Sequence, residues 1–327
     1  MGLRRKANSF VFRYLFLLIS HSEAEFILLN LGICNCFLAW LGFNQQIPHR
    51  VEDPKTVVAF EEFCRDRLSH AEIVDILEGR SPLEAVVEDI LLKMHIQAKC
   101  RALCMDALSH IRRKAFHIQQ IERIAKIPVN EDNQEAFPLF YEVWAALDDR
   151  EVPESFEVTK SIGKGEVDYP SWGDLGFQTP LTDFRMTGLL GLKCLHHVST
   201  EFKARARQVL AATSNTDTWL PCAITSVNVT AWVMEDAKKD KLSVFLYKDY
   251  SATSQIFYTL HAFYFFSFVN YWNNSDAKTI LDFKKVSEGF RDYIIIELEK
   301  ITDAYISMKN YEEGYMNAIL LDSISKL

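Results

Sequence analysis

From residue 53 onward, apolar residues recur at intervals of three and four positions, and this spacing limits the fold more than any other feature of the chain. Such intervals place side chains on one face of an α-helix, whereas a half-buried strand needs strict alternation. No alternating run of strand length competes with the helical pattern. The sequence therefore predicts an all-α protein, with helical runs around residues 54–64, 83–94, 104–124, 139–147, 189–198, 219–236, 256–272 and 280–308.

The composition sets broad limits on the class of protein. A chain of 327 residues with 49% apolar side chains can bury a large core, as one domain or as a main domain with an N-terminal appendage. The net charge of −8 argues against a nucleic-acid binder, because neutralising phosphates requires a concentrated lysine and arginine surface. The seven cysteines are odd in number, scattered, and too few for a disulfide-built scaffold. They favour a reducing compartment.

The N-terminus is basic and then apolar. Three basic residues at positions 4–6 precede a hydrophobic stretch over residues 10–43, in which residues 26–43 form an apolar run of 18 residues. Three interpretations remain open: a secretory signal, which Arg13 inside the stretch weakens; a membrane span at the short edge of the usual length; or a buried or membrane-surface helix.

Two short motifs predict helix starts. Asp53 followed by Pro54 is typical of an N-cap with proline at the first helical position. Ser81-Pro82-Leu83-Glu84 matches a capping box, in which the Ser81 hydroxyl and the Glu84 carboxylate satisfy free amides. Residues 149–171 collect proline, glycine and charge without an apolar period, which indicates a surface loop or hinge. The IGKG within them lacks the spacing of a phosphate loop.

Two further features are better explained by burial than by a special function. The run over residues 256–272 is apolar nearly all round, which suits a core helix or a membrane span; its 17 residues, broken by polar side chains, favour the core. Cys100 and Cys104 lie four apart with His95 nearby, like half of a zinc site. The remaining ligands are not evident, so buried cysteines are the favoured interpretation.

The stretch WGDLGFQTPLTDFRMTGLLGL places one arginine, Arg185, between a turn-rich segment and a leucine-rich helix. We expect Thr182 or Asp183 to cap that helix, which puts Arg185 in its first turn, where the helix dipole disfavours a cation. Either Asp183 pairs with the guanidinium and ties the loop to the helix, or Arg185 points outward at an anion of a partner. Gly188 and Gly191 predict that another backbone packs closely against this helix.

The same stretch resembles the motif of the ELMO (engulfment and cell motility) domain, in the branch of short ELMO domain-containing proteins. The resemblance continues in PCAITSVNVTAW, FVNYW and LDFKKV, and upstream in LEAVVEDILLKMHI and the long helix that ends near Ile127. It covers nearly the whole chain from about Ser81. It implies an all-helical fold built as a single ELMO domain, with an apolar N-terminal helical segment as a family-like feature.

We expect five segments along the chain. They are a basic and apolar N-terminal segment (1–50), a helical N-terminal part of the ELMO region (51–148), a loop (149–171), the ELMO domain core (172–310) and a C-terminal tail (311–327).

The resemblance also implies GTPase-activating action on Arf and Arf-like small GTPases, with Arg185 of the TDFR motif as the essential residue. An arginine supplied by a partner stabilises the charge on the transferred phosphoryl group by about 10³ to 10⁵ in rate. GTP and Mg²⁺ would belong to the GTPase, so no cofactor of this chain is expected. Asp183 would orient the guanidinium. The supporting positions are Trp172, Gly176, Phe177, Gln178, Pro180, Thr182, Asp183, Phe184 and Gly188.

Two departures from the family pattern keep other functions open. Met186 stands where the family usually has glycine, and a single residue, Thr179, separates Gln178 from Pro180 where about three are usual. The alternative function is an interaction scaffold of the kind formed by the large ELMO proteins, which act with Dock-type exchange factors for Rac. A membrane-tethered adaptor without activity is a third possibility.

The two ends of the chain indicate different locations. Residues 1–43 would hold the protein at the cytosolic face of an intracellular membrane, where Arf-family GTPases work. Ser325-Lys326-Leu327 matches the peroxisomal import tripeptide, which gives the alternative location. We favour the cytoplasm and a cytosol-facing membrane, because short address motifs are weak.

Overall fold

The computed structural model describes the chain from Pro54 to Leu327, with gaps. The described residues are 54–96, 98–148, 158, 172–214, 219–248, 255–277, 279–308 and 315–327. They form helices without any strand, which confirms the all-α prediction within these ranges. The expected apolar N-terminal helix, the Asp53 cap and nearly all of the loop at 149–171 lie outside the described residues.

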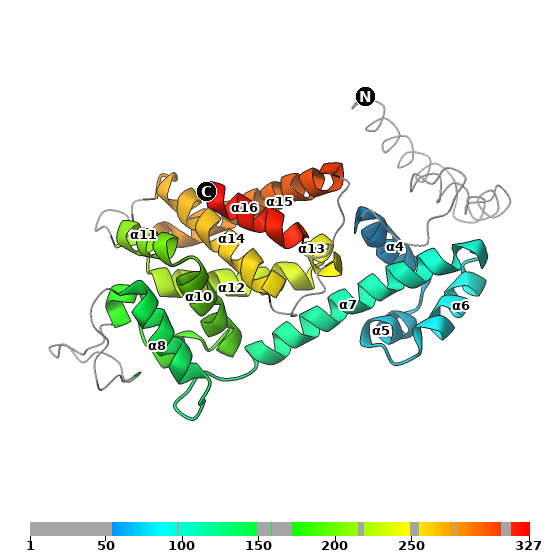
Figure 1. Ribbon diagram of the computed structural model, residues 1–327, viewed down its shortest axis with the longest axis horizontal. Coiled ribbons are helices and arrows are strands. Elements are labelled where there is room, and N and C mark those ends of the chain that lie inside the picture. The colour runs from blue at the N-terminus through cyan, green and yellow to red at the C-terminus, as the bar shows by residue number, and fades with distance from the viewer. Residues whose placement is uncertain are drawn as a thin grey trace.

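The helices belong to two groups, each with its own hydrophobic core (Figure 1). The smaller core lies among α4 (Pro54–Arg67), α5 (His70–Glu78), α6 (Leu83–Lys93) and the first part of α7 (Arg101–Ala125). The larger core lies among α8 (Ala136–Leu147), α10 (Gly188–Glu201), α11 (Lys203–Thr213), α12 (Cys222–Lys238), α13 (Ser243–Lys248), α14 (Gln255–Asn273), α15 (Phe283–Met308) and α16 (Tyr315–Lys326). Figure 1 shows α7 running from the first group to the second. One continuous helix therefore links the two cores.

Helix α14 lies at the centre of the larger core. Most of its side chains are buried on all sides, which confirms that this apolar run is a core helix. Among the described helices, none combines the length and the apolar character that a membrane span requires. A buried carboxylate orients the surrounding helices: Asp236 of α12 accepts hydrogen bonds from Arg291 of α15 at 2.8 Å and from Tyr264 of α14 at 3.2 Å. Burial and the nearby carboxylate raise the pKa of Tyr264, so its phenol remains a donor.

A buried lysine joins the N-terminal helices to α13. The Lys114 ammonium of α7 lies 2.7 Å from both carboxylate oxygens of Glu61 in α4 and 2.6 Å from Asp240, which precedes α13. Tyr247 of α13 donates its hydroxyl to Glu61, and Arg65 pairs with the same carboxylate at 2.6 Å. Burial raises the pKa of Glu61, but Lys114 and the other donors outweigh it, so the net pKa is lowered. Glu61 is therefore held as a carboxylate.

The prediction of a capping box at Ser81 and Glu84 is wrong. Helix α6 begins at Leu83 without a side-chain cap, and the Ser81 amide donates to the Asp75 carboxylate at 3.0 Å. A capping box forms one helix earlier, where Ser69 and Glu72 satisfy each other's backbone amides at the start of α5. The prediction of buried cysteines is confirmed for Cys100 and Cys104, which lie in the smaller core and are not joined by a disulfide.

Candidate functional site

Arg185 lies in a tight turn, and the prediction that it occupies the first turn of the leucine-rich helix is wrong. A short helix, α9 (Pro180–Asp183), begins after Thr179, and α10 begins at Gly188. The four residues between them form the turn, in which the amides of Thr187 and Gly188 both donate to the Phe184 carbonyl. The chain starts a helix at Pro180 because proline is well suited to a first helical position. Arg185 therefore projects from a junction between two helices.

Asp183 supports the turn through the backbone. Its Oδ2 atom accepts hydrogen bonds from the amides of Gln178 at 2.9 Å and Thr179 at 3.0 Å. No ion pair joins Asp183 to Arg185 in the described part of the chain, so of the two interpretations the one in which Asp183 pairs with the guanidinium is not found. Burial raises the pKa of Asp183, and the two amides and the nearby charge of Arg185 act in the opposite direction without outweighing it. The carboxylate closes the loop onto the start of α9 and leaves the arginine to other partners.

An aromatic cluster anchors the loop and the turn to α8. Trp172 packs edge-on against Phe140 and Trp144, with ring centroids 5.4 and 5.6 Å apart. Phe177 and Phe184 pack against Phe140 at 6.1 and 5.9 Å. Three of these four contacts are edge-to-face, and such contacts add to the free energy gained from burial. Phe184 is thereby fixed immediately before Arg185.

The end of α7 lies against the start of α10. Gly188 has a φ of +51°, and a Cβ atom on it would lie 2.2 Å from the Ala125 carbonyl oxygen and 2.5 Å from that of Ile127. The close backbone predicted at this glycine is therefore present. At Gly191 the prediction is wrong, because the tight neighbours are side chains: the Thr187 hydroxyl would lie 2.2 Å from an added Cβ.

A second glycine joins the loop to α12. Gly176 has a φ of +85°, and an added Cβ would lie 2.3 Å from the Cys222 amide nitrogen, where α12 begins. The Gly176 carbonyl accepts a hydrogen bond from the Ile224 amide at 3.3 Å. The loop that precedes Arg185 is therefore bound to α12 on one side and to α8 on the other.

The guanidinium itself is exposed to solvent. Among the described residues its one hydrogen bond goes to the Thr182 carbonyl, at the long distance of 3.4 Å. The neighbouring side chain, Met186, is 75% exposed, whereas Phe184 and Thr187 on either side are 1% and 0% exposed. The site is thus two exposed side chains held between two buried ones, and it can offer a cation to an anion on another molecule.

The structure divides the other predicted site residues into buried supports and exposed neighbours. Pro180 is buried at the start of α9, whereas the side chains of Gln178 and Thr182 are exposed near Arg185. Sequence reasoning missed the partners from other helices, Phe140 and Trp144 on α8. Their spacing of four residues on an apolar face was the available signal.

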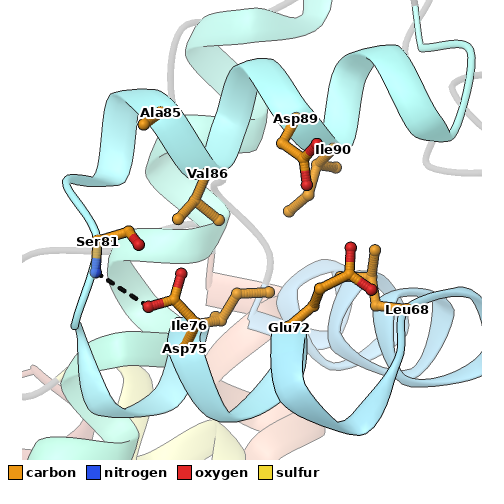
Figure 2. Close-up of a pocket in the computed structure, with 9 residues that line it drawn as sticks. All are labelled: Leu68, Glu72, Asp75, Ile76, Ser81, Ala85, Val86, Asp89 and Ile90. Atoms are coloured by element: carbon orange, nitrogen blue, oxygen red, sulfur yellow. Dashed lines mark hydrogen bonds between the residues drawn. The ribbon is translucent and has the colours of Figure 1, made fainter.

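Two cavities elsewhere lack comparable chemistry. One of about 220 Å³ lies between α5 and α6, where Glu72 and Ile76 of α5 face Asp89 and Val86 of α6 (Figure 2). Lys93 pairs with both of these carboxylates. The other, of about 530 Å³, lies among α14, α15 and α16 and is mostly apolar. Within the described residues, no cluster of three or more histidine, cysteine or acidic side chains could hold a metal ion.

Comparisons with known proteins agree with this architecture. The model of the ELMO/CED-12 family matches residues 119–287, from within α7 to the N-terminal part of α15. ELMO domain-containing protein B of Dictyostelium discoideum is 33% identical over 178 residues, which cover 54% of this chain and 58% of that protein. ELMO domain-containing protein 2 of Bos taurus is 27% identical over 223 residues, 66% of this chain and 72% of that protein. No solved structure matches the chain. Because the family model covers just over half of the chain and includes the Arg185 turn, this protein belongs to the ELMO/CED-12 family.

Proposed function

We propose that this protein is a GTPase-activating protein for Arf and Arf-like small GTPases, to which it presents Arg185 in trans. The proposal rests mainly on one observation. The guanidinium of Arg185 is exposed to solvent, on a turn whose flanking residues, Phe184 and Thr187, are buried. Its long hydrogen bond to the Thr182 carbonyl is a weak one. Transfer to a phosphate of a partner would therefore break no ion pair within the described part of the chain.

The size of the expected effect favours a catalytic role over a structural one. Arginine fingers raise phosphoryl-transfer rates by about 10³ to 10⁵, which corresponds to about 4 to 7 kcal/mol. An exposed ion pair contributes about 0 to 1 kcal/mol. In a site like this one, the greatest benefit of the guanidinium therefore comes from charge that develops on another molecule.

In this proposal, the chain and the GTPase supply different parts of the catalytic site. The chain supplies a planar cation with two donor nitrogens that can reach two phosphoryl oxygens together. The partner would supply GTP, Mg²⁺ and the residue that orients water. Residues 172–188 act as the support, because their aromatic, glycine and carboxylate contacts hold the backbone on either side of Arg185.

The test is single-turnover GTP hydrolysis by a panel of Arf and Arf-like GTPases with and without the full chain. We expect at least one GTPase to be accelerated, and Arg185→Lys to reduce the acceleration by orders of magnitude while the melting temperature stays unchanged. Arg80→Lys, which alters an exposed arginine far from the turn, serves as the matched control. If no GTPase in the panel is accelerated, the scaffold function with Dock-type exchange factors takes its place. A comparable loss of stability in Arg185→Lys would assign the arginine to the turn itself.

We also infer that the protein works in the cytoplasm, at a membrane surface contacted by residues 1–43, which lie outside the described residues. In support, Ser325 and Lys326 of the C-terminal tripeptide lie within α16, where Lys326 pairs with Asp322, and Leu327 packs against the larger core. An import receptor reads such a tripeptide as a free end. Imaging of N-terminally tagged protein, with and without residues 1–43, tests the inference. Peroxisomal signal that disappears on deleting Leu327 would overturn it.

A further inference from the structure

Met186 is an exposed apolar side chain next to the proposed arginine finger. From Asp183 to Leu192 every residue is buried except Arg185 and Met186. Single exposed apolar residues are common and need no explanation alone. This one differs because its position is shared with Arg185: any surface that receives the guanidinium must also accommodate the methionine beside it.

The turn fixes the backbone positions from which the two side chains project. Phe184 is buried in the aromatic cluster, and its carbonyl accepts the Gly188 amide at 2.6 Å and the Thr187 amide at 3.0 Å. Thr187 is fully buried against Gly191. With both flanking residues held, the backbone of Arg185 and Met186 cannot rotate without breaking these contacts. A surface that binds Arg185 therefore lies within reach of the Met186 side chain.

The neighbouring backbone adds a second apolar side chain. Ile127 is 40% exposed at the end of α7, and its carbonyl accepts the Leu189 amide at 2.8 Å, three residues beyond Met186. The backbone next to an exposed isoleucine is therefore joined to the helix that follows the Arg185 turn. A partner that receives Arg185 meets the exposed Met186 as the next residue along the chain.

We propose that Met186 is a specificity-determining contact, which packs against an uncharged, apolar patch that borders the phosphates of the bound nucleotide on the GTPase. The inference rests on the proposed function and specifies the partner for the same site. A GTPase with a charged group at that patch is disfavoured, because its charge would be buried against a thioether without a partner. Methionine suits this role because its flexible side chain adapts to an irregular surface.

The experiment measures how hydrolysis depends on GTPase concentration, and how tightly each GTPase loaded with GDP and aluminium fluoride binds the full chain. Met186→Asp should raise the half-saturating concentration about ten- to a hundredfold, the loss expected for one buried apolar side chain, with little change in the limiting rate. Met186→Leu should remain close to the parent. Met186→Gly should change the rank order of the GTPases. Leu92→Asp, which alters a side chain that is 76% exposed on α6, is the matched control and should have no effect.

The outcomes separate the inference from the proposed function. If the parent accelerates hydrolysis and Met186→Asp has the same half-saturating concentration and GTPase ranking, the inference is overturned while the function stands. If the parent binds a GTPase without accelerating it, the proposed function fails, and weaker binding of Met186→Asp still supports the contact. A parent that neither binds nor accelerates any GTPase overturns both.

Discussion

The backbone amide of Leu189 donates a hydrogen bond of 2.8 Å to the carbonyl oxygen of Ile127. The segment that follows α7 and the beginning of α10 are therefore joined by a main-chain hydrogen bond. Leu189 lies two residues after Thr187, the last residue of the turn that carries Arg185. Side-chain substitutions at Leu189 or Ile127 leave this bond in place. Its geometry depends on Gly188, whose missing side chain lets the two backbones meet.

Gly188→Ala should strongly destabilise the protein. The added Cβ would lie 2.2 Å from the Ala125 carbonyl, and the left-handed φ of +51° adds strain. We expect the free energy of unfolding to fall by about 3 kcal/mol or more, measured by urea denaturation, since overpacking and backbone strain both contribute. Gly79→Ala is the control: it has a φ of +66° but nothing within 4 Å, so about 1 to 2 kcal/mol is expected. Equal losses in the two variants would contradict the close approach at Gly188.

Asp183→Ala should lower activity more than stability. The loss of one capping carboxylate costs about 1 kcal/mol, but it releases the Gln178 and Thr179 amides that hold the turn. Asp183→Asn keeps an acceptor oxygen, so it should retain most of the hydrolysis rate and most of the melting temperature. If asparagine proves as harmful as alanine, the negative charge acts on Arg185 or on the partner.

Lys114→Met should destabilise the protein by about 3 to 5 kcal/mol, because Glu61 would remain buried without its main counter-ion. Adding Glu61→Gln should recover part of that loss, as chemical denaturation of the single and double variants would show. Lys55→Met removes the exposed pair with Asp303 and should cost about 1 kcal/mol or less. A similar cost for both lysines would mean that the Lys114 site is open to water.

Acid should destabilise the protein through His261. Burial lowers the pKa of this fully buried imidazole to about 3, so the unfolded chain takes up its proton near pH 6.5 and the folded chain does not. The stability that the neutral His261 contributes to the folded protein is therefore present above pH 6.5. It is lost as pH falls toward 3, by up to about 1.4 kcal/mol of unfolding free energy per pH unit. His261→Leu should flatten the dependence of unfolding free energy on pH in this window. An unchanged slope would assign the acid sensitivity to other groups.

The helices were predictable because burial imposes a period that the sequence displays directly, and α14 is the plainest case. Helix starts were less predictable, since the sequence pattern of a capping box can occur at two places while the capping box itself forms at only one of them. Ser69 and Ser81 both precede a glutamate by three residues, but Asp75 takes the Ser81 amide, and the capping box forms at Ser69 alone. The choice depends on a tertiary contact that local sequence does not contain.

The same limit applies to the candidate site. The TDFR motif predicted Arg185 as the candidate residue, and its aromatic and glycine neighbours indicated a supported loop. The direction of Asp183 could not be predicted, because a carboxylate near a helix start can bind either backbone amides or a cation. The carbonyls that require Gly188 belong to Ala125 and Ile127, about 60 residues earlier in the chain, and pairing at that distance follows from the fold.

Helix α7 also decides how the protein can be divided for experiments. The family match begins at residue 119, inside this helix, so an expression fragment that starts there would lack the part that holds Lys114. Asp240 would lose its buried lysine, and Tyr247, which belongs to the smaller core, would be uncovered. A fragment that keeps the contacts of α7 with the N-terminal helices therefore begins at α4, well before the residue at which the family match starts.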